Sequence, residues 1–587
     1  MNFAAWRALG PVAAAQAALD AVDAFADPAL FITRVPADRV LASAAAAPHG
    51  PLHGLPFVVK DNIDCAGLPT TAACPDSAYL PVEDSPAVAR LMAAGAVLLG
   101  KVNLDQFATG LAGVRSPHGT PRNALLPGHI PGGSSSGSAT AVAAVIAAFS
   151  LGTDTAGSGR IPAAAQELVG LKPSLGLVPT RGVVPACRSL DCVSVLATSV
   201  ADAAAVLQVI AGTDAADPYS RAAPAGWRAQ GAPMTGRLAV PHGGQLVFDT
   251  VADAARFDAA IARFEALGAS IHRVDIAPLL EVARRLYEGA WVAERTEAIR
   301  DRVEHKPQTL HPVTRGILAG GLGKLTVDAF ADFHAAAQAR LFARDIFSSA
   351  DALLLPTHPG LPTLADLEAA PRAANARLGT YTNVVNLCDL SALAVPNGRR
   401  GDGVPCGVTL VGPAFAEATL TGLAAAFLGE LAADEIALFC IGAHMSGLPL
   451  NHQVLRHGGR LVAAGRTVPE YRLFDMGPRP GMLRVAQGGV AQGGVTQSGV
   501  TEAGVARGGM AQSGLTQGGV AIAGETWAIP AASLGPFLAE IPPPLGFSRV
   551  WLEDGSTPLG FIAEPAGIAG LPDISASGGW RAFLETR

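Results

Sequence analysis

The sequence has few charged residues and no excess of positive charge. Charged residues make up 16% of the 587 positions, and 42 Lys and Arg against 49 Asp and Glu give a net charge of −7. Because clustered Lys and Arg dominate binding to a phosphate backbone, this balance argues against a nucleic-acid partner.

Cysteines are few, and no two of them form a C-x-x-C pair, which would indicate a zinc or iron–sulfur site. The seven positions are scattered along the chain: Cys65, Cys74, Cys187, Cys192, Cys388, Cys406 and Cys440. The thirteen histidines likewise lack an H-E-x-x-H motif. We therefore expect reduced thiols, a cytoplasmic protein, and neither a metal nor a cofactor.

The chain also lacks an apolar run long enough to cross a membrane, which needs about 20 residues. Its longest uncharged, mostly apolar run, residues 139–151, is shorter than that and contains Thr140 and Ser150. The Ala-rich segment 12–25 contains Asp20 and Asp23, so it fits an amphipathic helix better than a secretory leader. We expect no membrane contact and a buried helix over 139–151.

Hydrophobic residues are abundant, at 50% of the chain, which is enough to bury a large core. Short apolar runs alternate with longer Ala-rich stretches between about residues 50 and 430. The pattern predicts strands at 55–59, 97–99, 237–240 and 352–355, and helices at 87–94, 140–149, 200–210, 251–267 and 329–347. This alternation predicts an α/β fold in which helices cover a mixed β-sheet.

A boundary is expected near residue 435, where a last helix over 416–433 gives way to a new strand over 436–442. We predict a catalytic domain over 1–434 and a smaller α+β domain over 436–587. Within the second domain, residues 486–520 form seven pentads of the type AQGGV.

The pentads are compatible with a small ligand-binding β-coil or with an expanded hairpin loop. The runs 481–485 and 525–529 would be the two strands that such a loop joins. Two Gly in many pentads make ordering costly in entropy, and one apolar residue in five cannot form a core. The repeat is therefore predicted to be a flexible loop that is dispensable for chemistry.

The densest chemical signal is the segment 131–160, where two clusters of Gly and hydroxyl residues flank an apolar helix. The first cluster, 132–138, could cradle a phosphate at a helix N-terminus, but it lacks the Lys that closes a nucleotide-binding loop. The second cluster, 152–160, follows the helix. Two such turns on one helix could bring two serines side by side.

Three motifs in this region resemble those of the amidase signature family: LPFVVKD over 55–61, GGSSSGS over 132–138 and GTDTAGS over 152–158. They stand in the order found in that family. The resemblance implies that Ser158 is the nucleophile, that Ser134, preceded by a cis peptide bond, is a bridging serine, and that Lys60 is the base.

This assignment is chemically reasonable, because a serine hydroxyl becomes a good nucleophile only when a neighbouring base takes its proton. A lysine can act as that base only when burial keeps it neutral. The resemblance also implies an oxyanion hole at the amides of Thr155, Ala156 and Gly157, extended by that of Ser158. Asp154 and Arg160 are expected to brace this turn and not to react.

Within the family, the chain is most similar to the allophanate hydrolases. The segment 180–194, TRGVVPACRSLDCVS, resembles their version of the region after the nucleophile. Tyr287 and Arg295 match the pair that holds the substrate in such enzymes, and Gly133 is implied as a further substrate contact. Eight residues is just over two helical turns, so we expect Tyr287 and Arg295 to reach one pocket from one helix.

The second domain resembles the C-terminal domain of long allophanate hydrolases, on the segments 441–453 and 578–583. The resemblance implies that it assists loss of carbon dioxide from the first product, N-carboxycarbamate. His444 and His452 are the candidate proton carriers, although His444 could equally well pack a strand-to-helix turn.

The resemblance thus implies hydrolysis of allophanate to ammonia and carbon dioxide in urea or related nitrogen catabolism. A homodimer is implied by the resemblance, with urea carboxylase or another pathway enzyme as a further partner. Two alternatives stay open: a family hydrolase for another small amide, and a non-catalytic subunit of an amidotransferase-like assembly.

Overall fold

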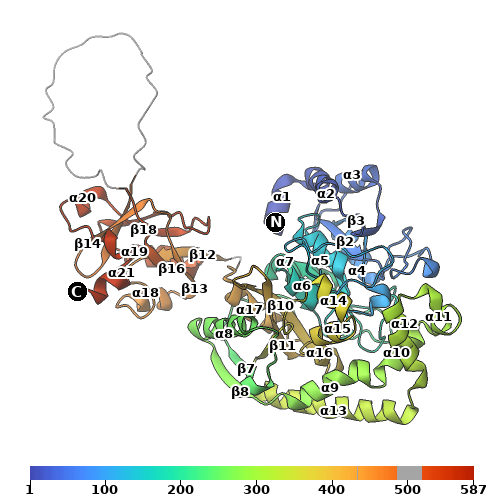
Figure 1. The fold of residues 1–587 in the computed structure, drawn as a ribbon. Helices are drawn as coiled ribbons and strands as arrows, with labels where there is room; N and C mark the ends of the chain where they lie inside the picture. The colour runs from blue at the N-terminus through green and yellow to red at the C-terminus, as the bar shows by residue number, and fades with distance from the viewer. Residues whose placement is uncertain (433, 486–517) are drawn as a thin grey trace, which may run out of the picture. The chain divides into compact units, whose positions relative to one another are not determined.

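The chain forms two compact units, Met1–Glu430 and Leu431–Arg587. The computed structural model describes residues 1–432, 434–485 and 518–587, and Figure 1 shows their helices and strands. The prediction of a flexible loop over 486–520 falls outside the described residues up to position 517.

A large mixed sheet forms the centre of the first unit, with its strands in the order β1-β3-β2-β4-β6-β5-β10-β11-β9-β7-β8. Strand β4 is parallel to β2 and antiparallel to β6. The bounds are β1 Phe31–Arg34, β2 Pro56–Lys60, β3 Val97–Val102, β4 Phe149–Asp154, β5 Val169–Lys172, β6 Cys192–Ala197, β7 Arg237–Pro241, β8 Ser270–Val274, β9 Ala352–Pro356, β10 Leu390–Arg399 and β11 Pro405–Pro413. The expected α/β fold with a mixed sheet is confirmed.

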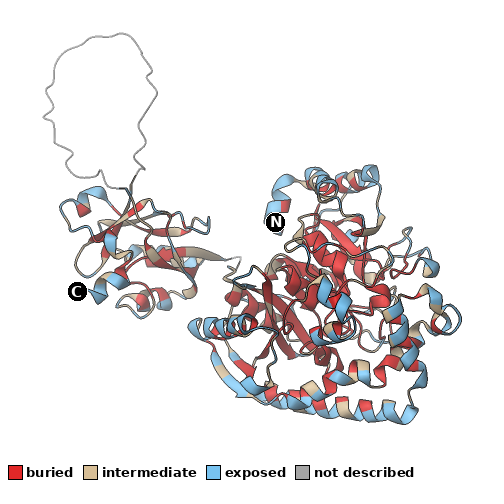
Figure 2. Ribbon diagram, viewed as in Figure 1, coloured by how far each residue is buried: buried red, intermediate tan, exposed pale blue. Residues whose placement is uncertain are grey.

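Helices pack against this sheet and bury its central strands, whereas the edge strands β1 and β8 remain partly exposed (Figure 2). Several begin at a hydroxyl residue that caps the first turn, such as Ser199 before α7 and Thr250 before α8. The bounds are α1 Phe3–Leu9, α2 Pro11–Phe25, α3 Ala37–Ala45, α4 Pro86–Ala93, α5 Ser136–Ala143, α6 Arg160–Ala165, α7 Val200–Ile210, α8 Val251–Ala266, α9 Ala277–Glu288, α10 Trp291–Ala298, α11 Arg300–His305, α12 Pro312–Ala319, α13 Thr326–Ser349, α14 Leu364–Ala369, α15 Ala373–Leu378, α16 Asn383–Leu387 and α17 Glu417–Leu428.

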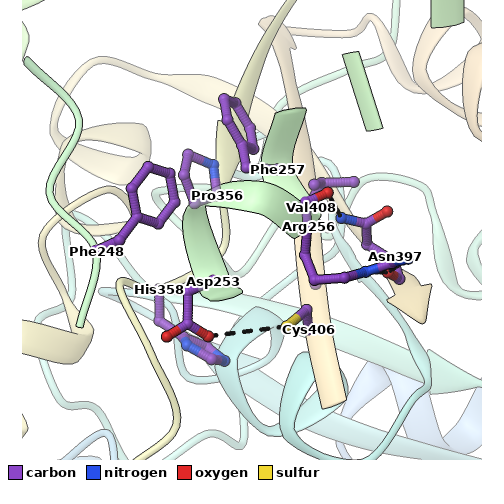
Figure 3. Close-up of a pocket in the computed structure, with 10 residues that line it drawn as sticks. Phe248, Asp253, Arg256, Phe257, Pro356, His358, Asn397, Cys406 and Val408 are labelled. Carbon is purple, nitrogen blue, oxygen red and sulfur yellow. Dashed lines mark hydrogen bonds between the residues drawn. The ribbon is translucent and has the colours of Figure 1, made fainter. Parts of the chain in front are cut away.

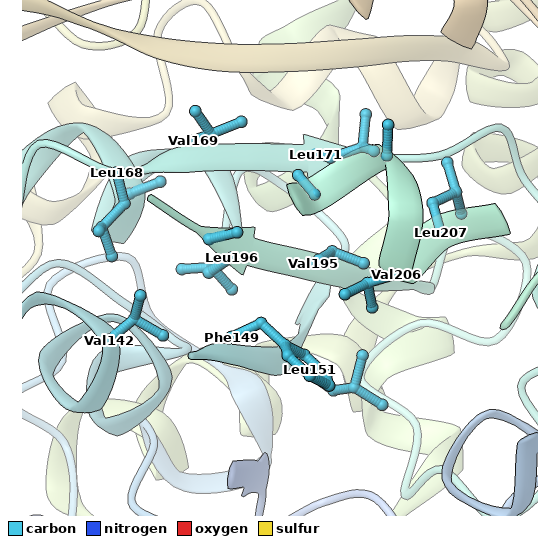
Figure 4. Close-up of a cluster of buried hydrophobic side chains, with 14 of the residues drawn as sticks. Val142, Phe149, Leu151, Leu168, Val169, Leu171, Val195, Leu196, Val206 and Leu207 are labelled. Carbon is cyan, nitrogen blue, oxygen red and sulfur yellow. The ribbon is translucent and has the colours of Figure 1, made fainter. Parts of the chain in front are cut away.

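The core beside the central strands contains aliphatic side chains from neighbouring elements (Figure 4). Leu151 of β4 and Val195 of β6 lie there with Leu207 of α7, and all three are fully buried. This packing holds β4 and β6 in place, and the polar turns that follow β4 and precede β6 are positioned with them.

The helix predicted over 140–149 is wrong in its second half. Helix α5 ends at Ala143, Val145 has a positive φ of 57°, and Phe149 already begins strand β4. A short apolar run does not distinguish a buried helix from a buried strand, and here the run contains the end of one and the start of the other.

The second unit contains a five-stranded sheet in the order β13-β16-β12-β18-β17 and a separate pair, β14 and β15. Its strands are β12 Glu435–Cys440, β13 Arg460–Arg466, β14 Tyr471–Asp475, β15 Pro480–Arg484, β16 Ala523–Pro530, β17 Leu545–Arg549 and β18 Leu559–Ala563, and its helices are α18 Asn451–Arg456, α19 Ala531–Ala539, α20 Pro565–Ile568 and α21 Trp580–Glu585. The strands expected on either side of the repeat exist as β15 and β16. They belong to different sheets, so the prediction that they pair as one hairpin is wrong.

No helix among the described residues is long and apolar enough to span a membrane.

Candidate active site

Lys60 is the last residue of β2, and its ammonium group lies among hydroxyl groups in the interior. Its Nζ is 2.7 Å from Ser134 Oγ and 2.7 Å from Thr153 Oγ1. The parallel pairing of β2 with β4 brings Lys60 beside Thr153, because both stand at the same ends of adjacent strands. The structure thus joins the Lys and the first serine that sequence motifs predicted.

Burial lowers the pKa of Lys60 from 10.5 to about 7, although the carboxylates of Asp105, Asp191 and Asp154 oppose the shift. The amine is fully buried, so the neutral form is favoured by the loss of hydration. A lysine with a pKa near neutrality can accept a proton from a hydroxyl group at ordinary pH.

Ser134 lies just before α5, and the peptide bond that joins it to Gly133 is cis, as the resemblance implied. Ser135 Oγ donates to the carbonyl of Thr153 at 3.1 Å, and its amide donates to the carbonyl of Ser158 at 3.3 Å. These bonds fasten the first Ser-rich turn to the second, so the segments of Ser134 and Ser158 lie side by side.

The turn that carries Ser158 is held by a buried ion pair. Arg160 makes two hydrogen bonds of 2.9 Å to the two oxygens of Asp154, and both side chains are fully buried. The same carboxylate accepts the amides of Gly157 and Gly159. Asp154 and Arg160 therefore brace the turn, as predicted, and Ser158 lies at its centre with 2% of its surface exposed.

One of the expected oxyanion donors is already engaged. The amide of Gly157 donates to Asp154 Oδ1 at 2.8 Å, so its proton is directed into the brace. Only the amides of Thr155 and Ala156, with that of Ser158, are left as candidates for this role. Similarly, the Gly133 amide donates to the carbonyl of Leu111 at 2.8 Å and is not available to a substrate.

Arg295 and Tyr287 meet as predicted, with the guanidinium carbon 4.8 Å from the centre of the phenol ring. The single helix expected for them is wrong: Tyr287 belongs to α9, which ends at Glu288, and Arg295 belongs to α10. The break between the helices turns the two side chains toward each other, which the sequence spacing alone could not reveal.

The guanidinium of Arg295 is buried and none of its three nitrogens has a hydrogen-bond partner within the described chain. Burial disfavours its charge, yet the surrounding Tyr287, Cys187, Asp191 and Glu294 raise its pKa above the usual value. A buried, charged and unpartnered fork of N–H groups is suited to a planar anion such as a carboxylate.

Residues that sequence analysis did not single out complete this region. Thr153 supports Lys60, and Asn386 of α16 donates to the carbonyls of Asp154 and Leu190. Asp191 accepts a hydrogen bond of 2.5 Å from Thr155 Oγ1. Asp191 stood within the 180–194 motif, but nothing in its spacing indicated a contact with the nucleophile turn.

The first unit contains a cavity beside Asp191 and another at α8. One of about 150 Å³ is lined by Asp191 together with Thr180, Arg181, Val183, Pro185, Arg188, Ala216, Asp217, Pro218 and Tyr219. A much smaller one, of about 20 Å³, lies between α8 and strands β9 to β11, with His358, Asp253 and Cys406 around it (Figure 3). The second has room for about one water molecule and contains none of the predicted catalytic residues.

In the second unit, the two candidate histidines differ in burial and in their contacts. His444 is buried, stacks 4.8 Å from the ring of Phe561, and its Nε2 is 2.9 Å from Gln453 Oε1. His452 is exposed, with Nδ1 near the carbonyl of Pro449. A groove of about 360 Å³ in this unit is lined by Glu525, Arg581 and others, but by neither histidine. These contacts favour a packing role for His444.

The structure joins a large mixed sheet, two turns that carry Ser134 and Ser158, and a buried Lys60. Residues 11–421 match the family model described as Amidase, and the chain belongs to that family. Residues 436–494 and 499–585 match the model of the allophanate hydrolase C-terminal domain, so the chain joins both domains. No group of three or more potential metal ligands occurs among the residues that the structure describes.

Some similar proteins match nearly the whole chain, and others match about its first two thirds. The structure of allophanate hydrolase from Kluyveromyces lactis is 36% identical, with a TM-score of 0.66 and coverage of 97% of each chain. Urea amidolyase from Saccharomyces cerevisiae is 38% identical over 91% of this chain, which spans only 30% of that longer protein. One subunit of the glutamyl-tRNA(Gln) amidotransferase from Thermotoga maritima matches 70% of this chain and 90% of its own, with 28% identity and a TM-score of 0.60.

Proposed function

We propose that this amidase hydrolyses allophanate to ammonia and carbon dioxide, in urea or related nitrogen catabolism. The main support for this substrate is the buried guanidinium of Arg295, which has no hydrogen-bond partner within the described chain. Leaving such a group unsatisfied costs free energy, whereas a carboxylate would satisfy it with two charge-assisted bonds. Similarity to the K. lactis allophanate hydrolase over the whole chain supports the same substrate.

In the proposed mechanism, neutral Lys60 takes a proton from Ser134, which takes one from Ser158. The Ser158 oxygen attacks the terminal amide carbonyl of the substrate, and the C–N bond breaks as ammonia leaves with the proton. The amides of Thr155, Ala156 and Ser158 stabilise the oxyanion. Water then attacks the acyl-enzyme and releases N-carboxycarbamate. This product loses carbon dioxide to leave carbamate, which decomposes to a second ammonia and a second carbon dioxide.

Arg295 and Tyr287 bind the substrate carboxylate in this scheme. Their 4.8 Å contact supports a shared site, because the phenol ring fixes the guanidinium plane. Gly133 has a structural role in this proposal: a Cβ there would collide with Asp105 Oδ2, so only glycine lets Ser134 approach Lys60.

For the second unit, we propose assistance in the loss of carbon dioxide from N-carboxycarbamate, on the basis of its domain match. His444 and His452 remain the candidate proton carriers. Replacing each by Gln and measuring carbon dioxide and ammonia separately tests this role. A carrier is expected to slow the release of carbon dioxide and of the second ammonia, because N-carboxycarbamate keeps one of the two nitrogens of allophanate, and to leave the first ammonia unchanged. Wild-type rates of both products in both variants would exclude the histidines.

We also propose a cytoplasmic homodimer that works with urea carboxylase or another enzyme of the pathway. Helix α13 supports the dimer, because its Phe330, Phe333 and Leu341 are more than half exposed. The seven cysteines, all free, support a reducing compartment. The greater length of the urea amidolyases supports a pathway partner.

A second candidate is hydrolysis of another small amide, or a non-catalytic role in an amidotransferase-like assembly, which the similarity to the T. maritima protein favours. The discriminating experiment compares ammonia release from allophanate and from biuret, in which a neutral amide replaces the carboxylate. We expect a kcat/KM for allophanate at least about 100-fold higher, and no release by Ser158→Ala. Equal use of both substrates would overturn the substrate, and no release from either would favour the non-catalytic role.

A further inference from the structure

The loop 186–191 connects the nucleophile turn to the helix that carries Arg295. It leads directly into β6, whose first residue, Cys192, lies opposite Asp154 at the end of β4. The two strands are antiparallel, so the residue before Cys192 and the residue after Asp154 are neighbours. These residues are Asp191 and Thr155.

The Asp191 carboxylate holds this junction. Its Oδ1 accepts a hydrogen bond of 2.5 Å from the Thr155 hydroxyl. Its Oδ2 accepts hydrogen bonds from the amides of Ala186 at 2.9 Å and Cys187 at 3.1 Å. The residue is buried, with 6% of its surface exposed. One carboxylate therefore fixes the side chain of a proposed oxyanion residue and the backbone of the loop.

The other side of the loop is attached to α10 through Glu294, the residue before Arg295. Glu294 accepts the Ser189 amide and the Ser189 hydroxyl, both at 2.8 Å, and the Cys187 thiol at 3.0 Å. The loop is thus bound to α10 through Glu294, the residue before the proposed anchor, and to the turn of Ser158 through Asp191.

We propose that Asp191 is a positioning residue that aligns the oxyanion donors with the substrate carboxylate held by Arg295. This inference rests on the proposed function. The loop sets a fixed separation between the anchor and Ser158, so the enzyme favours turnover of amides whose carboxylate lies at that separation. Asp191 touches neither the substrate nor the reacting atoms.

Variants that break this contact are expected to lower kcat more than they raise KM. Thr155→Val removes the hydrogen bond to Asp191 and keeps every charge, whereas Asp191→Asn removes the charge and one of the two acceptor oxygens. We expect each to lower kcat for allophanate by about 10- to 100-fold with KM within about threefold, because small displacements of reacting groups are costly. The double variant should lose less than the product of the two single losses, because the two residues share one hydrogen bond.

The pH dependence of kcat/KM distinguishes the positioning role of Asp191 from the effect of its charge on Lys60. Asp191, Asp105 and Asp154 are the carboxylates that act on Lys60, and loss of one lowers the pKa of the amine further. The acid limb of kcat/KM should therefore move to lower pH in Asp191→Asn and stay in place in Thr155→Val. Thr155→Ser, which keeps the hydroxyl, should turn over at least about tenfold faster than Thr155→Val.

Thr250→Val is a matched control, since Thr250 Oγ1 donates to Asp253 at 2.6 Å at the start of α8, outside the site. Its kcat should equal that of the wild type. Unchanged kcat in Thr155→Val, or a loss confined to KM, would overturn the inference even if Asp191→Asn did not fold. Wild-type protein inactive on allophanate would instead overturn the proposed function.

Discussion

Replacing Arg295 by Met removes the proposed carboxylate anchor and keeps a long apolar stem in its place. The guanidinium has three buried nitrogens without a partner in the described chain, so a substrate carboxylate can accept at least two charge-assisted hydrogen bonds. At about 1.5 to 3 kcal/mol each, the variant loses about 3 to 6 kcal/mol of transition-state binding. At 1.36 kcal/mol per factor of ten, kcat/KM for allophanate should fall by about 10² to 10⁴.

The assay measures initial ammonia release from allophanate and biuret at one pH. The loss of kcat/KM should appear for allophanate and be less than about tenfold for biuret, which has no carboxylate to bind.

Malonate, a small dicarboxylate, should raise the melting temperature of the wild type and not that of Arg295→Met, because a ligand stabilises only a state that binds it. Arg284→Met is the control on the neighbouring helix, since Arg284 is mostly exposed and pairs with Glu281. Equal losses for both substrates, or a malonate response in the variant, would refute the carboxylate anchor.

Three further predictions follow from the same geometry. Because burial lowers the pKa of Lys60 to about 7, falling pH protonates the base and kcat/KM should drop about tenfold per unit below that value; a profile flat to pH 5 would contradict this. Asp154→Asn leaves Arg160 buried without its counter-charge, so urea unfolding should show a loss of about 3 to 5 kcal/mol, and unchanged stability would contradict the brace. Gly133→Ala places a Cβ against Asp105 Oδ2 and should lower kcat at least about 100-fold with an unchanged circular dichroism spectrum, whereas wild-type kcat would show that the Ser134 turn tolerates the methyl group.

Much of the fold was accessible from the sequence because its strongest patterns are local. The strands at 55–59 and 237–240 and the helix at 200–210 appear within a residue or two of the predicted bounds. The failure over 140–149 has a local cause too: an apolar run has no periodicity that marks where α5 ends and β4 begins.

For the site residues that lie in sequence motifs, the motifs predicted which residues take part. The contacts between them came from the structure. Lys60 and Ser134 are 74 positions apart, yet the motifs identified both, and the fold brings them within 2.7 Å. Asp191 and Asn386 escaped prediction because the hydrogen bonds that join them to the Ser158 turn are long-range. Such bonds depend on strand pairing and helix placement, which no local spacing reveals.

The most direct test of the central claim is mass spectrometry of the protein after mixing with allophanate and acid quenching. We predict an adduct on the peptide that contains Ser158, observed as a carbamoyl group because acid removes the N-carboxyl group as carbon dioxide. No adduct is expected in Ser158→Ala, and far less in Lys60→Met. Ammonia release that continues in Ser158→Ala, without any adduct at Ser158 in the wild type, would contradict it.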